Sequence, residues 1–326
     1  CGGCYFMKET STPLLLINIL ADGEIHSGEQ LGESLGMTRA GINKHIKTLR
    51  SWGIDIHTVA GQGYQLDAPM NLLNSERVNR GIQGAPARVI PVIDSTNQYM
   101  IQRISELTSG DVCIAEYQSA GRGRRGRQWI SPFGRNLYLS MYWKLDQGPA
   151  AAIGLSLVVG VILAEVLQQF GANGVKVKWP NDLYLNDKKL SGILVELTGK
   201  TGDVAHIVTG IGINIAMSNN QKDAINQQWI NLEQVGIKID RNQLACEITN
   251  ALRKAFVQFE KQGLSAFIER WKSLDNFIDR RVKLIIGDKE IFGIAKGINE
   301  QGALLLEQNN KIVPYIGGEI SLRSAP

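Results

Sequence analysis

The chain contains 326 residues, more than one typical domain of ~150 residues, so we expect two or three domains. Hydrophobic residues make up 44% of the chain and charged residues 20%, and these fractions exclude wholesale disorder. The net charge of +4 is too small to identify a nucleic-acid-binding protein by itself, and four cysteines are too few for a disulfide scaffold.

The first six residues, Cys-Gly-Gly-Cys-Tyr-Phe, precede Met7. A single pair of cysteines is a weak signal for a metal or redox site, and we interpret residues 1–6 as a remnant of cloning. Cys113 and Cys246 lie in apolar surroundings, as buried free thiols do in a reducing compartment. No secretory signal follows Met7, and the uncharged stretch 150–164 is shorter than the ~20 apolar residues of a membrane-spanning helix. We therefore expect a cytoplasmic protein in which this stretch is a buried helix.

Residues 7–68 are predicted to form a winged helix-turn-helix domain. Residues 14–20 have the apolar character of a first helix. Ser27 and Thr38 are suited to be helix N-caps, so each is expected to begin a further helix, with Gly36 ending the first of the two. Two short helices separated by a glycine turn are typical of a helix-turn-helix.

The third predicted helix carries positive charge, with four basic residues and no acidic one over 37–53. Alternating apolar residues over 54–58, a glycine-rich turn and a short return strand predict a β-hairpin wing beside it. Winged helices bind either DNA or protein, and the basic helix favours DNA. Because Ile42, Ile46 and Leu49 repeat at helical spacing, they are expected to face the core. The side chains expected to face DNA are Arg39, Asn43, Lys44, His45, Lys47 and Thr48.

Residues 69–274 are predicted to form a catalytic domain after a short linker at 67–69. Helical and strand-like segments are mixed here, which predicts an α/β or α+β domain with a largely antiparallel sheet. We expect a helix from Ser95 to Leu107 and further helices over 150–170 and 241–261. We expect strands over 88–93, 112–117, 137–143, 175–178, 182–185, 190–197 and 206–210.

Residues 275–326 contain short alternating strands and glycine turns, which predict a small SH3-like β-barrel. The predicted fold is therefore an α+β multidomain chain: an N-terminal winged helix-turn-helix, a central mixed α/β catalytic domain and a C-terminal barrel.

Residues 121–127, Gly-Arg-Gly-Arg-Arg-Gly-Arg, follow a predicted strand and match the dinucleotide-binding pattern G-x-G-x-x-G. That function is rejected because residues 129–134, Trp-Ile-Ser-Pro-Phe-Gly, cannot begin the helix that it requires. Two interpretations stay open, a solvated basic loop and a cradle for a phosphate or carboxylate. The glycines favour the cradle, since they let backbone N–H groups approach an anion closely.

A second polar segment runs from Lys178 through Trp-Pro-Asn to Asp182, and a hairpin turn then leads to Lys188 and Lys189. A lysine at a hairpin turn is commonly solvated, and this applies to Lys188. Lys189 precedes small residues that would let a ligand approach the strand, and its ammonium suits an anionic phosphoryl centre. Asp182 would either hold Mg²⁺ on a triphosphate or be a turn residue. Residues 210–214, Gly-Ile-Gly-Ile-Asn, lack bulky side chains at alternate positions and end in a polar one.

Together with Asp94-Ser95-Thr96-Asn97, these segments resemble the motifs of biotin protein ligases, in the same order along the chain. With the helix-turn-helix in front, the chain from Met7 onward resembles the bifunctional type, which is both biotin–[acetyl-CoA-carboxylase] ligase and biotin operon repressor. The resemblance implies an enzyme that uses ATP and Mg²⁺ to form biotinyl-5′-AMP and transfers biotin to a lysine of the biotin carboxyl carrier protein. It also implies a repressor that binds operator DNA as a homodimer when biotinyl-5′-AMP is bound.

The resemblance further implies a role for individual residues. Lys189, Arg122 and Arg124 would be catalytic. The residues implied to bind biotin or the adenylate are Ser95, Thr96, Asn97, Gln118, Gly121, Arg122, Gly123, Arg124, Lys189 and Gly192. Those implied to bind the nucleotide are Asn181, Asp182, Asn214 and Trp229, with Asp182 also a metal ligand. Three other functions stay open: a ligase for lipoate or another acid, a repressor with an inactive catalytic domain, and a ligase whose winged helix contacts only protein.

Overall fold

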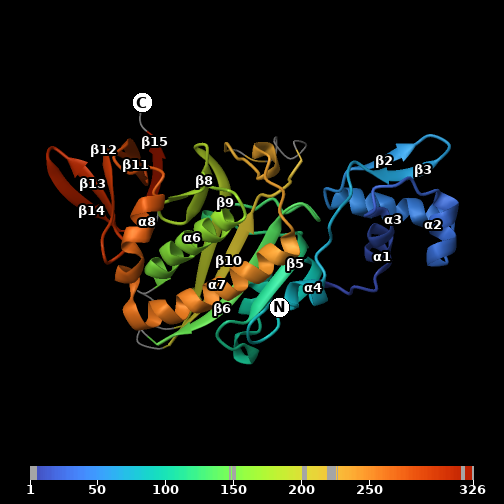
Figure 1. Cartoon of the computed structure of the whole chain (residues 1–326), viewed down its shortest axis with the longest axis horizontal. Helices are drawn as coiled ribbons and strands as arrows, with labels where there is room; N and C mark the ends of the chain where they lie inside the picture. Colours follow the sequence, from blue (N-terminus) through green and yellow to red (C-terminus); the bar gives the residue numbers. More distant parts are fainter. Residues whose placement is uncertain are drawn as a thin grey trace.

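The computed structural model describes residues 6–146, 148, 152–199, 204–218, 225, 227–316 and 320–324. Three domains follow one another along the long axis, with the helix-turn-helix at one end, a large sheet in the middle and a small β-domain at the other end (Figure 1). Of the segment interpreted as a cloning remnant, residues 1–5 lie outside the described residues. Phe6 pairs with the central sheet as part of strand β1.

The N-terminal domain has the predicted helices and wing. Its elements are α1 (Thr12–Leu20), α2 (Gly28–Leu35), α3 (Arg39–Ser51), β2 (Ile56–Val59) and β3 (Gly63–Leu66). The Ser27 side chain accepts a hydrogen bond from the Gln30 amide, and Thr38 accepts one from the Gly41 amide, so both predicted N-caps are confirmed. Gly36 ends α2 in the left-handed conformation at φ 64°.

The central domain is built on an eight-stranded sheet with the strand order β1-β4-β5-β6-β10-β9-β8-β7. Its strands are β1 (Phe6–Met7), β4 (Arg88–Ile93), β5 (Val112–Gln118), β6 (Leu137–Leu145), β7 (Lys176–Lys178), β8 (Asp182–Leu185), β9 (Lys188–Thr198) and β10 (Ala205–Ile213). Among the described strands only β4 and β5 run parallel, so the prediction of a largely antiparallel sheet is confirmed.

Helices cover both faces of this sheet. Those of the central domain are α4 (Ser75–Asn79), α5 (Thr96–Ile101), α6 (Ala152–Gln169), α7 (Arg241–Gln262) and α8 (Ile268–Leu274). The long helices α6 and α7 share the main hydrophobic core with one face (Figure 1), and α5 packs against the other face in a separate hydrophobic cluster. The helix predicted to reach Leu107 ends at Ile101 and is followed only by a 3₁₀ turn (Ile104–Glu106). At this end the Arg103 side chain donates a hydrogen bond to the Tyr99 carbonyl.

Of the apolar stretch predicted as a buried helix, residues 152–164 belong to α6, whose side chains between Leu155 and Leu167 are almost all buried, while residues 150 and 151 lie outside the described residues. Within the described part of the chain, no helix has the length and apolarity needed to cross a membrane.

The C-terminal domain is a five-stranded sheet with the order β14-β13-β12-β11-β15. Its strands are β11 (Arg281–Ile286), β12 (Lys289–Ile298), β13 (Leu304–Gln308), β14 (Lys311–Tyr315) and β15 (Ile320–Ser324). It is joined to the central domain by the Trp179 indole, which donates to the Gly302 carbonyl at 3.0 Å, and by the Asn276 amide, which donates to the Val177 carbonyl at 2.9 Å.

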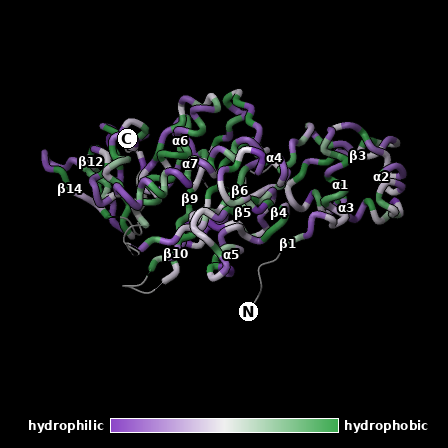
Figure 2. Tube along the Cα trace, turned by 60° about the horizontal axis from the view of Figure 1, so that its bottom comes forward, coloured by the Kyte–Doolittle hydropathy of each residue, from purple (hydrophilic) through white to green (hydrophobic). Residues whose placement is uncertain are grey.

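The helix-turn-helix domain packs directly on the central domain. Trp52, at the end of α3, stacks on Tyr117 and Phe133 with ring centroids 5.8 and 5.6 Å apart, and the Phe133 amide donates to the Trp52 carbonyl. Close to these rings, β1 pairs with β4 (Figure 2). The two domains therefore share a hydrophobic cluster that includes Met70 from the linker.

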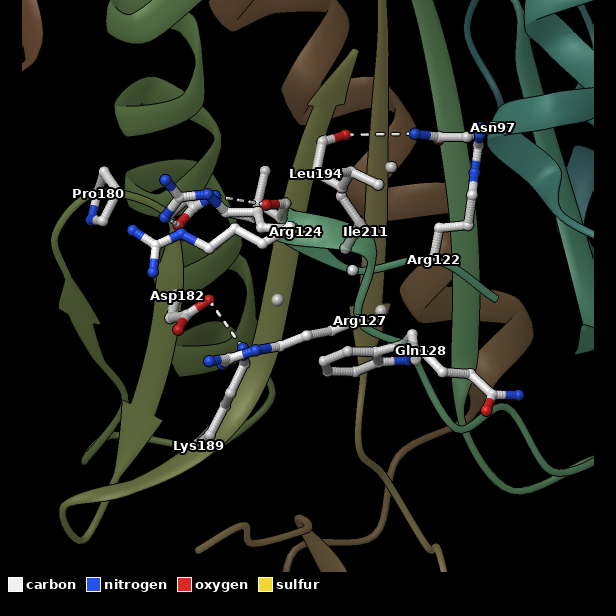
Figure 3. A pocket seen from close by; sticks show the side chains of 18 of the residues that line it. Asn97, Arg122, Arg124, Arg127, Gln128, Pro180, Asp182, Lys189, Leu194 and Ile211 are labelled. Carbon is white, nitrogen blue, oxygen red and sulfur yellow. Dashed lines mark hydrogen bonds and ion pairs between the residues drawn. The ribbon is translucent and has the colours of Figure 1, made fainter. Parts of the chain in front are cut away.

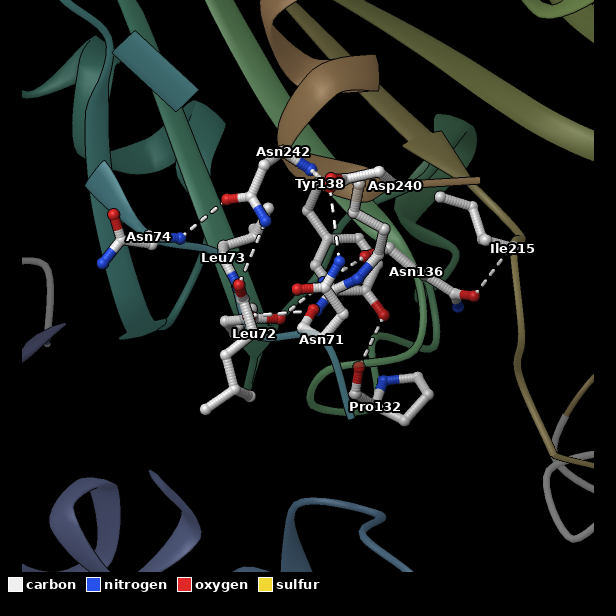
Figure 4. A network of polar contacts seen from close by, with 12 residues as sticks. Asn71, Leu72, Leu73, Asn74, Pro132, Asn136, Tyr138, Ile215, Asp240 and Asn242 are labelled. Carbon is white, nitrogen blue, oxygen red and sulfur yellow. Dashed lines mark hydrogen bonds and ion pairs between the residues drawn. The ribbon is translucent and has the colours of Figure 1, made fainter. Parts of the chain in front are cut away.

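A buried polar network fixes the segment that follows the linker, residues 70–74, to the rest of the central domain (Figure 4). The Arg241 guanidinium donates to the Glu116 carboxylate at 2.6 Å and to the Asn71 carbonyl at 2.8 Å. The Asn74 amide donates to the Asn242 side chain at 2.8 Å. Arg241 and Glu116 are only 5% and 2% exposed, so removing one partner would leave an uncompensated buried charge.

Candidate functional site

The predicted motifs meet at one pocket between the sheet and the arginine loop, which we define as residues 121–130 (Figure 3). The predicted site residues that line it are Ser95, Thr96, Asn97, Gln118, Arg122, Gly123, Arg124, Asn181, Asp182, Lys189 and Gly192. Gly121, Asn214 and Trp229 are not among the lining residues. Gly121 is buried against Trp129 and Ser131, and Asn214 is buried directly after β10. The Trp229 backbone pairs with that of Lys189 in an isolated β-bridge.

One end of the pocket is a set of hydrogen-bonded neutral side chains at the start of α5. Ser95 is the N-cap of this helix. The Thr96 amide donates to the Gln118 side-chain oxygen at 3.0 Å, and the Ser140 hydroxyl donates to Asn97 Oδ1 at 2.5 Å. Fixed neutral donors and acceptors of this kind suit an uncharged polar group such as a cyclic urea.

The opposite end carries the charged groups. Lys189 Nζ lies 3.1 Å from Asp182 Oδ1, with the two side chains 15% and 20% exposed. Arg124 Nη1 donates to Asn181 Oδ1 at 3.2 Å. Asn181 Nδ2 donates to the Ile193 carbonyl, so its side chain is held against β9. Lysine and arginine groups gathered around one space are suited to bind anions.

Lys178 is a further ionisable group at this end that sequence reasoning did not assign to the site. Its Nζ donates to the Tyr184 hydroxyl at 2.8 Å, and the residue lines the pocket. Burial lowers the pKa of Lys178 to about 7, because an ammonium loses hydration there. The sequence signal that could have indicated this role is that Lys178 directly precedes the Trp-Pro-Asn-Asp segment.

The glycines of β9 and β10 make room for a side chain of the protein itself. A Cβ atom on Gly212 would lie 2.4 Å from the Trp129 ring, and one on Gly192 would lie 2.9 Å from it. The space above the small residues after Lys189, which we expected a ligand to use, is thus partly filled by the Trp129 indole. Trp129 lines the pocket with Lys189 Nζ 5.5 Å from its ring centroid, so a ligand there would contact the indole.

The arginine loop forms a small hairpin and no α-helix, so the rejection of a dinucleotide fingerprint is confirmed. The Gly123 amide donates to the Arg127 carbonyl at 2.7 Å, and Arg125 adopts the left-handed conformation at φ 58°. Arg122 points to the neutral end of the pocket and Arg124 to the charged end (Figure 3).

The predicted DNA-facing residues lie on the solvent side of α3. Arg39, Asn43, Lys44 and Lys47 are exposed, and His45 and Thr48 are half-buried. Arg50 is also basic, but its guanidinium donates to the Ile56 carbonyl and to Thr58, so it holds the wing to the helix.

The comparisons with known proteins agree with this architecture. Residues 89–214 match the biotin/lipoate A/B protein ligase family, residues 277–323 the biotin protein ligase C-terminal domain and residues 14–65 an HTH domain. The chain is 66% identical over 319 residues to the bifunctional ligase/repressor BirA of Salmonella typhimurium, which covers 98% of this chain and 100% of that protein. The chain belongs to the biotin protein ligase family. The bifunctional ligase/repressor BirA of Escherichia coli is 64% identical, over 98% of this chain and 99% of that protein.

A solved structure of this family, the biotin protein ligase from Aquifex aeolicus in complex with biotin and ATP, is 28% identical and superposes with a TM-score of 0.63. It covers 73% of this chain and 99% of that one. Since both of these BirA proteins, which match this chain over 98% of its length, are bifunctional ligase/repressors, the chain is a biotin protein ligase of the bifunctional ligase/repressor type.

The residues of the charged end also fit a magnesium nucleotide. Magnesium is commonly held by one or two carboxylates together with substrate phosphates. Asp182 supplies one carboxylate at the pocket, and no group of three or more metal-binding side chains occurs among the described residues. A single carboxylate beside several cations suits an ion that arrives on a triphosphate.

Proposed function

We propose that this chain joins biotin and ATP to form biotinyl-5′-AMP, transfers the biotinyl group to a lysine of the biotin carboxyl carrier protein, and represses the biotin operon with the adenylate as corepressor. The observation that carries the catalytic part is the division of one pocket into two ends. Neutral fixed side chains lie around Asn97, whereas the cations Lys189 and Arg124 and the buried amine of Lys178 lie around Asp182.

This division suits the proposed reaction. A biotin carboxylate oxygen attacks the α-phosphorus of ATP, an O–P bond forms, and pyrophosphate leaves with the electrons of the bond that breaks. Both reactants are anions, so catalysis requires that they be aligned and that their repulsion be neutralised. We assign Lys189 to the carboxylate and the α-phosphate, and Arg124 to the phosphates. We assign the ring system of biotin to Ser95, Thr96, Asn97 and Gln118.

The remaining assignments concern the nucleotide and its metal. Asp182 would hold Mg²⁺, which neutralises phosphate charge when bound, and Asn181 would orient Arg124. Asn214 and Trp229 would support the adenosine part from the segment after β10. In the second half-reaction the amine of the carrier lysine attacks the acyl carbon of the adenylate, AMP leaves, and an amide forms.

Mass spectrometry of a biotin carrier domain, after incubation with this chain, biotin, ATP and Mg²⁺, tests the proposal. We expect the mass of one biotinyl group to be added at one lysine. Pyrophosphate exchange with biotin or with lipoate as the acid distinguishes the two ligase functions. Exchange with lipoate alone would contradict the assignment of the neutral end.

For the repressor part, we propose that two copies bind a palindromic operator as an adenylate-bound homodimer. One α3 offers few phosphate contacts, and a second copy roughly doubles them. If the adenylate promotes operator binding, the operator must tighten adenylate binding by the same factor. Sedimentation with and without biotinyl-5′-AMP measures the dimer affinity, and equal affinity in both states would contradict this control. Because these activities use ATP and chromosomal DNA, we propose the cytoplasm as their compartment.

A further inference from the structure

Glu196, on β9, contacts two groups of the pocket without lining it. Its Oε2 accepts a hydrogen bond from Arg122 Nη2 at 2.8 Å and another from Asn97 Nδ2 at 2.8 Å. Arg122 belongs to the arginine loop, whereas Asn97 belongs to α5, at the neutral end. One carboxylate oxygen therefore joins the loop to the residues that we assign to the biotin ring.

Glu196 helps to determine which way the Asn97 amide faces, together with the Leu194 carbonyl, which also accepts a hydrogen bond from Asn97 Nδ2 at 3.3 Å (Figure 3). An ionised carboxylate only accepts hydrogen bonds, so it takes the Nδ2 group and leaves Oδ1 to the Ser140 hydroxyl. Asn97 is 4% exposed, and a Cβ atom on Gly210 would lie 2.4 Å from its Oδ1. The amide is tightly enclosed, and Glu196, the Leu194 carbonyl and Ser140 together fix its donor and acceptor, with Glu196 making the shorter of the two contacts to Nδ2.

The contact with Arg122 holds the base of the arginine loop. Arg122 pairs with Gln128 in an isolated β-bridge, and the Gly123 amide bonds to the Arg127 carbonyl, so Arg122 lies where the small hairpin starts. β9 is paired with β10 over residues 191–198, which makes Glu196 a fixed point for the arginine loop, most of whose residues line the pocket.

We propose that Glu196 is a positioning residue that couples closure of the arginine loop to the orientation of Asn97, and so controls how long biotin and the adenylate stay bound. The inference rests on the proposed function and deepens it. Glu196 does not line the pocket, so its effect must pass through Arg122 and Asn97. Weakening the contacts of Glu196 should therefore affect the retention of biotin and the adenylate more than the chemical step.

The test compares Glu196→Gln with Glu165→Gln. Glu165 pairs with Arg270 at side-chain exposures of 33% and 37%, close to the 26% and 38% of Glu196 and Arg122, but it lies on α6 and does not line the pocket. We expect Glu196→Gln to release preformed biotinyl-5′-AMP about three- to tenfold faster and to raise the KM for biotin similarly, since an exposed ion pair contributes modestly. The kcat of pyrophosphate exchange should stay within about twofold, and Glu165→Gln should match the unmodified chain in all three measurements.

Arg122→Gln and the double variant show whether Glu196 acts through the loop. If it does, adding Glu196→Gln to Arg122→Gln accelerates adenylate release by less than Glu196→Gln accelerates it in the unmodified chain, and the remaining increase comes from the misoriented Asn97. Fully additive effects of the two substitutions would overturn the coupling. Unchanged release and KM in folded Glu196→Gln would also overturn it, as would a fall in kcat alone. If the unmodified chain forms no adenylate, the proposed function fails. Calorimetry of biotin alone then still tests the inference, with equal affinities of Glu196→Gln and the unmodified chain counting against it.

Discussion

Asp275 makes the stability of this protein depend on pH near neutrality. It follows α8, at the junction with the C-terminal domain, and is 6% exposed. Its Oδ1 accepts a hydrogen bond from the Phe277 amide at 2.9 Å, while its buried Oδ2 has no hydrogen-bond partner among the described residues. Burial raises the pKa of Asp275 from its ordinary value of 3.8 to about 7, since the carboxylate loses hydration.

The replacement Asp275→Asn is expected to stabilise the protein at alkaline pH. Between the two pKa values the folded state keeps a proton that the unfolded state has lost, so this contribution to stability is fully present below about pH 3.8 and is lost as pH rises from there to about 7. A pKa raised from 3.8 to about 7 corresponds to a cost of at most ~4 kcal/mol for the ionised form. Asparagine keeps an oxygen for the Phe277 amide and cannot ionise.

Thermal unfolding followed by circular dichroism at pH 5.5 and 8.5 measures this effect. We expect Asp275→Asn to be the more stable protein at both pH values, and its advantage to grow by about 2 kcal/mol between pH 5.5 and 8.5, because part of the cost is already present at pH 5.5. Asp279→Asn is the matched control, because that carboxyl is exposed and paired with Lys296. A difference that does not grow between the two pH values, or a less stable variant at pH 8.5, would refute the reasoning.

Three further predictions concern the pocket and the DNA-binding helix. Lys189→Ala should reduce pyrophosphate exchange by about 100-fold or more in a folded protein, as loss of a charge aimed at the transition state does; normal exchange would rule out its assigned role. Gly212→Ala should displace the Trp129 indole, which lies 2.4 Å from the new Cβ, and weaken biotin binding in calorimetry about tenfold; unchanged affinity would show that the indole does not contact biotin. Lys47→Ala should lower the salt dependence of operator binding by about one ion, with pyrophosphate exchange unchanged; a constant slope would mean that Lys47 does not meet a phosphate.

Local signals in the sequence predicted the elements well. Ser27 and Thr38 specify helix starts through hydrogen bonds within three residues, so their meaning can be read from neighbouring residues alone. The same holds for the hairpin turn at Asn186 and Asp187, which both adopt positive φ angles. The order of the motifs along the chain was sufficient to identify the family.

Contacts between distant segments could not be predicted in this way. The role of Gly212 depends on Trp129, which is more than eighty residues earlier in the sequence, and a glycine-containing strand looks the same whether a ligand or a side chain fills the space. From the sequence alone, Glu196 would be interpreted as a solvent-exposed charge on a strand. Its role becomes visible only in the fold, where the loop that carries Arg122 lies against it. The segments around Asn214 and Trp229 were assigned to the nucleotide by resemblance alone, and neither residue lines the pocket.

The two attachments of the helix-turn-helix domain have a consequence for operator architecture. The domain is held both by the pairing of β1 with β4 and by the stacking of Trp52 on Tyr117 and Phe133. Helix α3 therefore has a defined direction relative to the catalytic sheet, which a flexible tether would not give it. In the proposed homodimer, the separation of the two α3 helices would then be set by how the catalytic domains meet. The base sequence of each half-site would be read by α3, whereas the number of base pairs between half-sites would be a property of the enzyme portion of the molecule.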